Sequence, residues 1–297
     1  MKMSPLVISF SGGRTSGMMT KLLLDKYRGK REIVVIFSNT GKEYEETLQF
    51  VHNCDTYFGF NTVWIESVQN HGQRKSAGYR VVSFETADRT GAPFEDMIKK
   101  HGIPNKPFPH CSRELKNKPT LNYIKEVLKW DWYEIALGMR IDEPARLTVK
   151  ENVGYPMAYE WPTTKLMVNK WWLKQPFDLD MSRFTGGTPF PEYMGNCDRC
   201  WKKSKRKLLT LVKEGAHRND WWNDMEIKYG HFVPEGQKEK RIVPITFFRE
   251  NESMQDLIED CKFPFEKASD TFTLQQLMFS DPELDFTDGC EESCEAF

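Results

Sequence analysis

The sequence predicts an α/β fold built on a parallel sheet, because strand-like and helix-like segments alternate along its first half. Residues 6–10 are a short run of apolar and β-branched side chains, typical of a buried strand. A Gly-Ser-rich loop follows, and residues 18–27 then carry apolar side chains at a helical period. The same order of strand, loop and helix starts again at residues 33–37, and residues 63–65 then predict a third strand. Parallel sheets of this kind bind ligands at the carboxyl ends of their strands.

The rest of the chain continues the alternation less regularly. Residues 70–91 are polar and contain glycines, which predicts a loop or lid, and residues 118–129 predict a helix. Residues 133–137 predict another strand. Between residues 151 and 196 the chain is rich in Pro, Trp and Gly around one predicted helix at 166–174, so we expect an irregular subdomain there.

The composition is that of an ordinary globular protein. The 297 residues carry 42 basic and 43 acidic side chains, and 39% of them are hydrophobic. The sequence has no run of about eighteen apolar residues and no signal-peptide pattern at its N-terminus. We therefore expect a cytoplasmic protein that does not enter a membrane.

The most informative stretch joins the first predicted strand to the first predicted helix. Its residues are Ser11, Gly12, Gly13, Arg14, Thr15, Ser16 and Gly17. Such a loop presents backbone N–H groups at the positive end of a helix dipole, and glycines let an anion approach the backbone. The loop therefore predicts a phosphate site, although Ser and Gly are also ordinary turn and N-cap residues. The P-loop of nucleoside triphosphatases is excluded, because the sequence has no G-x-x-x-x-G-K-[ST] segment.

Arg140, Glu143 and Arg146 follow the strand predicted at residues 133–137. On a helical turn, this spacing would place Glu143 beside both arginines and fix their guanidinium groups. Fixed guanidiniums suit a phosphate or sulfate oxyanion, and a surface ion-pair ladder is the structural alternative. Lys116 is a further candidate for the same anion site.

The seven cysteines are the other chemical signal. In a reducing compartment they serve as ligands, reactive thiols or core residues more often than as disulfides. Cys197 and Cys200 form a C-x-x-C pair, which suits one metal ion or cluster face, a redox dithiol at a helix start, or two unligated thiols. Cys54 and Cys261 lie in apolar or helical patterns and are expected in the core.

A basic stretch over residues 199–207 leads into a predicted helix with an apolar stripe at residues 208–212. The stretch suits either a nucleic-acid backbone or a solvated helix face. The balanced net charge gives no support for strong nonspecific binding to nucleic acid.

Several of these segments together resemble the PP-loop ATP pyrophosphatase superfamily and, within it, the phosphoadenylyl-sulfate (PAPS) reductase family. The loop at residues 11–17 is similar to SGG-x-D-S, with Thr15 where most members carry Asp. The stretch from Cys111 is similar to C-[ST]-x-x-L-K-x-x-P, and the stretch from Gly138 matches G-x-R-x-x-E-x-x-R. Both belong to the branch that resembles DNA phosphorothioation sulfur-transfer proteins.

The resemblance implies an adenine nucleotide alpha hydrolase-like core. It implies two domains, a PP-loop nucleotide-binding α/β domain over residues 1–150 and a cysteine-containing helical or irregular subdomain over residues 151–297. ATP or a PAPS-like nucleotide with Mg²⁺ would bind the loop at residues 11–17. The implied nucleotide site also includes Asn39, Thr40, Gly41 and Gly138.

The resemblance also implies a metal centre. Cys111 would join Cys197 and Cys200 in holding a 4Fe-4S cluster, with zinc as the alternative metal. Cys290 is the candidate fourth ligand, with Cys294 as its alternative.

Three functions follow from these readings. The first is an enzyme that adenylates an acceptor and transfers sulfur through the iron–sulfur centre, using Arg140, Glu143, Arg146 and Lys116 as catalytic residues. Nucleic acid is its candidate acceptor, and a sulfur donor protein is a candidate partner. The second is a sulfonucleotide reductase that acts on PAPS or adenylyl sulfate. The third is a nucleotide-sensing or nucleic-acid-binding module without catalysis, which Thr15 in place of Asp favours. The sequence indicates no oligomeric state.

Overall fold

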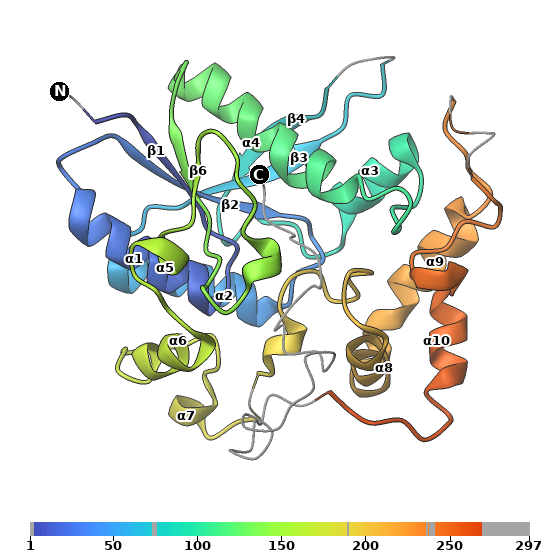
Figure 1. The fold of residues 1–297 in the computed structure, drawn as a ribbon. Coiled ribbons are helices and arrows are strands. Elements are labelled where there is room, and N and C mark those ends of the chain that lie inside the picture. The colour runs from blue at the N-terminus through green and yellow to red at the C-terminus, as the bar shows by residue number, and fades with distance from the viewer. Residues whose placement is uncertain (1–2, 73–75, 189, 236, 238–240, 269–297) are drawn as a thin grey trace. The chain divides into compact units, whose positions relative to one another are not determined.

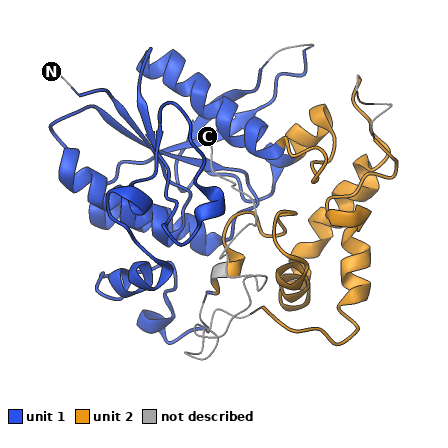
Figure 2. Ribbon diagram, in the orientation of Figure 1, with its two compact units in different colours: residues 1–94, 111–190, 294–297 blue, residues 95–110, 191–293 orange. Residues whose placement is uncertain are grey.

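The computed structural model describes residues 3–72, 76–188, 190–235, 237 and 241–268 (Figure 1). These residues fall into two compact units (Figure 2). The first consists of the described residues of 3–94 and 111–190, and the second of the described residues of 95–110 and 191–268. Residues 151–190 thus belong to the same unit as residues 1–94, and the predicted division into domains at residue 150 stays a prediction.

The first unit is built on a sheet with the strand order β4-β3-β2-β1-β5-β6. The strands are β1 (Leu6–Ser9), β2 (Ile33–Asn39), β3 (Val63–Val68), β4 (Gly78–Val82), β5 (Glu134–Ala136) and β6 (Val153–Gly154). All neighbouring pairs are parallel except β3 and β4, which are antiparallel. The prediction of an α/β fold with a parallel sheet is confirmed.

The helices of the first unit include the predicted helices and two short helices, at residues 156–159 and 182–185, that were not predicted. They are α1 (Arg14–Tyr27), α2 (Glu45–Phe58), α4 (Lys118–Tyr123), α5 (Pro156–Tyr159), α6 (Lys165–Trp172) and α7 (Ser182–Thr185), with a 3₁₀ turn at η3 (Pro144–Arg146). Two π-helical turns, η1 (Arg113–Asn117) and η2 (Ile124–Leu128), extend α4 at both ends. Figure 1 shows α1 and α2 on one side of the sheet and α4 on the other.

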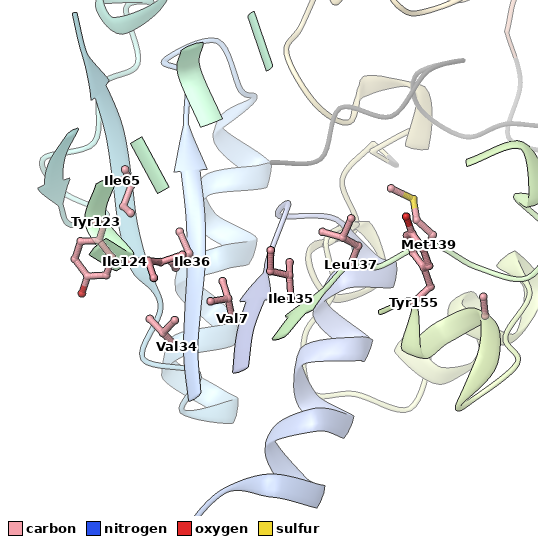
Figure 3. Close-up of a cluster of buried hydrophobic side chains, with 11 residues drawn as sticks. Val7, Val34, Ile36, Ile65, Tyr123, Ile124, Ile135, Leu137, Met139 and Tyr155 are labelled. Atoms are coloured by element: carbon pink, nitrogen blue, oxygen red, sulfur yellow. The ribbon is translucent and has the colours of Figure 1, made fainter. Parts of the chain in front are cut away.

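The sheet is buried because its strands are apolar on both faces. On one face the side chains of four strands meet residues from the α4 region and α5 (Figure 3). The labelled members of this cluster are Val7, Val34, Ile36, Ile65, Tyr123, Ile124, Ile135, Leu137, Met139 and Tyr155. Since side chains alternate along a strand, Ile8 and Val35 point to the opposite face, where they are also buried.

Three predicted elements differ from the structure. Helix α1 begins at Arg14, so residues 14–17, which we expected in the loop, form its first turn. The helix expected at residues 118–129 begins its helical path earlier, at Cys111. The segment expected to be a loop contains β4, an exposed edge strand whose polar residues obscure the strand pattern.

The described part of the second unit is helical. It contains most of α3 (Ala92–His101), η4 (Glu192–Met194), α8 (Lys205–Glu214), η5 (Ala216–Arg218), α9 (Asn219–Tyr229), η6 (Arg249–Asn251) and α10 (Met254–Asp260). Helix α8 is the helix predicted after Cys200, and its apolar stripe is buried. Among the described residues, no helix is long and apolar enough to cross a bilayer.

Candidate functional site

Three loops leave the carboxyl ends of neighbouring strands in the first unit. Residues 10–13 follow β1, residues 40–44 follow β2, and residues 137–143 follow β5. Because β1 lies between β2 and β5 and all three are parallel, the loops share one edge of the sheet. The chain crosses from β1 to β2 on one side, while β5 lies on the other, which makes this edge a topological switch point where such folds bind ligands.

Gly12 is a glycine for structural reasons. Its φ is +80°, in the left-handed region that side chains rarely adopt. A Cβ on Gly12 would lie 2.8 Å from Thr47 Cγ2 of α2 and 3.1 Å from the Phe37 ring. Gly12 therefore lets the loop turn tightly against α2.

Gly13 has neither constraint. Its φ is −101° and its ψ 163°, an extended conformation that any residue adopts. The nearest atom to a Cβ built there is Ser11 Oγ at 3.8 Å, so the space beside Gly13 contains no protein atom in close contact. Within the described chain, neither the Gly12 nor the Gly13 backbone N–H has a hydrogen-bond acceptor. The loop thus combines unsatisfied N–H donors with open space.

Two serines hold this loop in shape. Ser11 N donates to Ser16 Oγ at 3.2 Å, and the two hydroxyl oxygens lie 2.9 Å apart. Ser16 Oγ also donates to Gly13 O at 3.0 Å. The loop is therefore fixed in place before any ligand binds, at the positive end of the α1 dipole.

Arg14 and Gly17 face the segment around α6 instead. Arg14 Nε donates to the buried carboxylate of Asp178 at 2.7 Å, and Trp172 Nε1 donates to Arg14 O at 2.8 Å. A Cβ on Gly17 would lie 2.9 Å from Trp172 Cζ2. We predicted both residues in the nucleotide site, but in the structure they pack α1 against Trp172 and Asp178. The charge of Arg14 is balanced by Asp178.

The second loop has its backbone N–H groups occupied. Thr40 N and Lys42 N donate to Glu43 Oε2 at 3.0 and 3.2 Å, and Gly41 N donates to Asn39 Oδ1 at 3.1 Å. Asn39 in turn donates to the buried Glu66 at 2.7 Å. The loop therefore differs from the first, because these three amides already have acceptors within the protein.

Glu43 is a site residue that the sequence analysis missed. Glu43 precedes α2 and is only 8% exposed. Burial raises the pKa of Glu43 above its usual value, and the positive charge of Lys116 partly opposes this shift. Lys116 thus acts at the same edge as the loops. The signal available in the sequence was an acid three residues after Thr40. At this spacing, a carboxylate can accept hydrogen bonds from the backbone N–H groups of its own loop.

The third loop brings Arg140 to the first. Arg140 Nη1 donates to Thr15 Oγ1 at 3.3 Å, and its Nε donates to Asp142 at 2.8 Å. Gly138 is needed for close approach, because a Cβ there would lie 2.9 Å from Ser16 Cα. Thr15, which stands at the Asp position of the motif that this loop resembles, therefore contacts a guanidinium.

Glu143 holds both arginines, although not on the expected helical turn. Its carboxylate accepts from Arg140 N at 3.0 Å, lies 3.6 Å from Arg140 Nη1, and pairs with Arg146 Nη1. Only Pro144–Arg146 is helical, as a 3₁₀ turn, so the helical-turn expectation is wrong while the contacts are present. With Asp142 included, the two positive charges are matched by two negative ones.

The C-x-x-C pair lies in the second unit. Cys197 and Cys200 are 9% and 7% exposed, and Cys200 N donates to Cys197 O at 3.2 Å in a tight turn before α8. Cys111 lies in the first unit at half-buried exposure, and Cys290 and Cys294 lie outside the described residues. Among the residues that the structure describes, no group of three or more His, Cys, Asp or Glu side chains is arranged to hold a metal ion.

The basic stretch at residues 199–207 is neither a solvated face nor an open cationic surface. Arg199 and Lys203 are fully buried, and Arg199 donates to Leu211 O and Gly215 O at the end of α8. The exposed Lys205 pairs with Glu252 and with Asp260. This charge therefore caps a helix and forms ion pairs within the second unit.

Comparison with known proteins identifies the family to which the chain belongs. A family model described as the phosphoadenosine phosphosulfate reductase domain matches residues 5–153, and the chain belongs to this family. The chain is 30% identical over 296 residues to the uncharacterized nin region protein ORF290 of Escherichia phage lambda, covering 98% of this chain and 94% of the phage protein. Family membership supports a nucleotide-binding enzyme of the PP-loop type.

A more distant relative is an uncharacterized protein of Methanocaldococcus jannaschii, MJ0066. It is 29% identical over 149 residues, which is 50% of this chain and 25% of that protein. The shared part therefore spans about a quarter of the archaeal protein.

Proposed function

We propose that the protein binds ATP or a related adenine nucleotide at residues 11–17 and adenylates an acceptor, releasing pyrophosphate. The observation that carries this proposal is Gly13, whose Cβ position is open and whose N–H has no acceptor in the described chain. An open glycine beside unsatisfied amides at a helix start is what a phosphate group requires. The family match supports the same reading.

The neighbouring loops support roles for the charged residues. Arg140 contacts Thr15 and would lie against the phosphate bound by that loop, where it would stabilise charge that develops on the leaving group. Lys116 acts electrostatically at the same edge. Because the carboxylates near Arg140 and Arg146 already match their charge, a triphosphate would need Mg²⁺ as well.

We further propose that Cys111, Cys197 and Cys200 hold one metal centre, an iron–sulfur cluster in preference to zinc. The buried turn of Cys197 and Cys200 supplies two adjacent thiols, which suits half of a four-coordinate site. Such a centre would supply sulfur or electrons for transfer to the activated acceptor, with nucleic acid as the proposed acceptor.

Metal content tests this part of the proposal. Anaerobically purified protein should contain iron or zinc, and Cys111→Ser, Cys197→Ser and Cys200→Ser should each lower the content. Cys54→Ser is the matched control, because Cys54 is buried in α2. Full occupancy in Cys111→Ser, or no metal in any preparation, would contradict the proposed centre.

A sulfonucleotide reductase is the second candidate, favoured by the description of the matched family. Incubation with ATP, Mg²⁺ and candidate acceptors separates the two functions. Pyrophosphate release supports adenylation, whereas sulfite release from a sulfonucleotide with a thiol donor and no ATP consumption supports reduction. A nucleotide-binding module without catalysis would bind ATP and release neither product.

A further inference from the structure

The first unit has a cavity of about 510 Å³ beside β5 and β6. Its walls include Leu6 and Glu134, the first residues of β1 and β5, together with Tyr27 at the end of α1. None of the three loops at the carboxyl edge lines it. The cavity is therefore separate from the candidate nucleotide site.

Four aromatic residues contribute to the walls of this cavity. Tyr27, Trp132, Tyr155 and Tyr159 all line it. Trp132 is 55% exposed and Tyr159 70% exposed, so both present ring surface that the fold itself does not cover. The electron-rich faces of such rings attract cations, and Tyr27 already has the Arg31 guanidinium 5.5 Å from its ring centroid.

The charges around the cavity are unbalanced. Glu134, Glu151 and Glu160 line it, and Arg31 is the one basic residue among the lining residues. Glu134 pairs with Arg31 at 3.1 Å, and Glu160 pairs with Lys26. Within the described chain, Glu151 has no hydrogen-bond or ion-pair partner. A ligand that complements this cavity therefore carries positive charge and an apolar body.

We propose that this cavity binds an organic cation, an alkylguanidinium or alkylammonium group. The charged head would lie near Glu151, and the alkyl chain would pack against Trp132 and Tyr159. The same chemistry is available from a free amine or from a basic side chain of a peptide. The pocket gives this nucleotide-binding unit a second, independent ligand.

Calorimetric titration with matched compounds tests the proposal. Agmatine represents the free amine, N-acetylarginine amide represents the peptide side chain, and N-acetylcitrulline amide has nearly the same shape without the charge. At least one of the two cations should bind, and at least tenfold more tightly than the citrulline compound. Binding of agmatine alone identifies a free amine, and binding of the arginine amide identifies a peptide side chain.

Two substitutions place the binding in the cavity. Trp132→Ala should weaken binding about fivefold through loss of a cation–π partner. Glu151→Gln should weaken it and reduce its dependence on salt. Glu46→Gln, at an exposed position of α2 outside the cavity, should bind like the wild type. Equal binding of the citrulline compound, unchanged affinity in both cavity variants, or no binding of either cation would overturn the proposal.

Discussion

At the scale of single residues, Arg140 connects the loop after β5 with the first turn of α1. Its guanidinium donates to Asp142 from Nε and to Thr15 from Nη1, a geometry that depends on the planar fork of arginine. Lysine keeps the charge but offers only one nitrogen. Arg140→Lys should therefore lower turnover at least about tenfold, the equivalent of roughly 1.4 kcal/mol of transition-state stabilisation.

Arg89→Lys is the matched control for Arg140→Lys. Arg89 also forms a forked pair, with Glu45, but at an exposed position on the surface. Its substitution should leave turnover unchanged. Normal turnover in Arg140→Lys would mean that Arg140 belongs to a structural ion-pair group and not to the catalytic site.

Residue types were easier to predict than residue roles. Motif similarity placed Ser11–Gly17 and Arg140 at one edge of the sheet, where the structure also has them. It could not distinguish Gly13, with open space beside it, from Gly17, which packs on Trp172. That difference depends on residues more than 150 positions away in the sequence. The burial of Arg199 was missed for another reason, because a charged residue is normally expected at the surface.

At the scale of elements, the buried parallel strands were predicted well. Residues 33–37 are almost wholly apolar because both faces of β2 are covered, and this makes the run easy to find. In contrast, β4 pairs on one side only and exposes much of its surface, so it looked like a loop. Residues 14–17 were predicted as part of the anion-binding loop, and in the structure they also form the first turn of α1.

Helix α6 depends on Trp172 for its attachment to α1. The side chain is fully buried, packs against Phe50 and Phe177, and donates to Arg14 O. Trp172→Ala should lower the free energy of unfolding by about 3–5 kcal/mol, measured by urea denaturation, because it leaves a large cavity and removes the hydrogen bond to Arg14 O. The adjacent, partly exposed Trp171 gives the matched comparison: Trp171→Ala should cost clearly less, and equal losses would contradict this account of the packing.

At the scale of the whole molecule, stability should depend on pH through Glu226. Burial raises the pKa of Glu226 from its ordinary value of 4.5 to about 7, although the carboxylate accepts hydrogen bonds from Phe247 N and Met254 N. Between about pH 4.5 and pH 7, the Glu226 carboxyl is therefore protonated in the folded protein and ionised in the unfolded chain. The stabilising contribution is complete below about pH 4.5 and is lost as the pH rises through 7.

Glu226→Gln isolates this effect, because glutamine keeps the size of the side chain and does not titrate. The unfolding free energy of the wild type, relative to that of the variant, should fall by up to about 3 kcal/mol between pH 5 and pH 8. Urea denaturation at pH 5, 6.5 and 8 measures the difference. A difference that is constant with pH, or that grows toward pH 8, would show that Glu226 does not hold its proton in the folded state.

The claim that residues 11–17 bind the phosphates of an adenine nucleotide is tested most directly by the affinity for MgATP of two glycine variants. Gly13→Val should remain folded, with a loss of about 1 kcal/mol at the helix start, and should lose at least tenfold in affinity because its side chain occupies the space left for phosphate. Gly12→Ala should instead lose about 1–3 kcal/mol of stability, because φ is +80° and Thr47 is in the way. If folded Gly13→Val binds MgATP as tightly as the wild type in calorimetric titration, the loop does not bind the phosphates and the account is wrong.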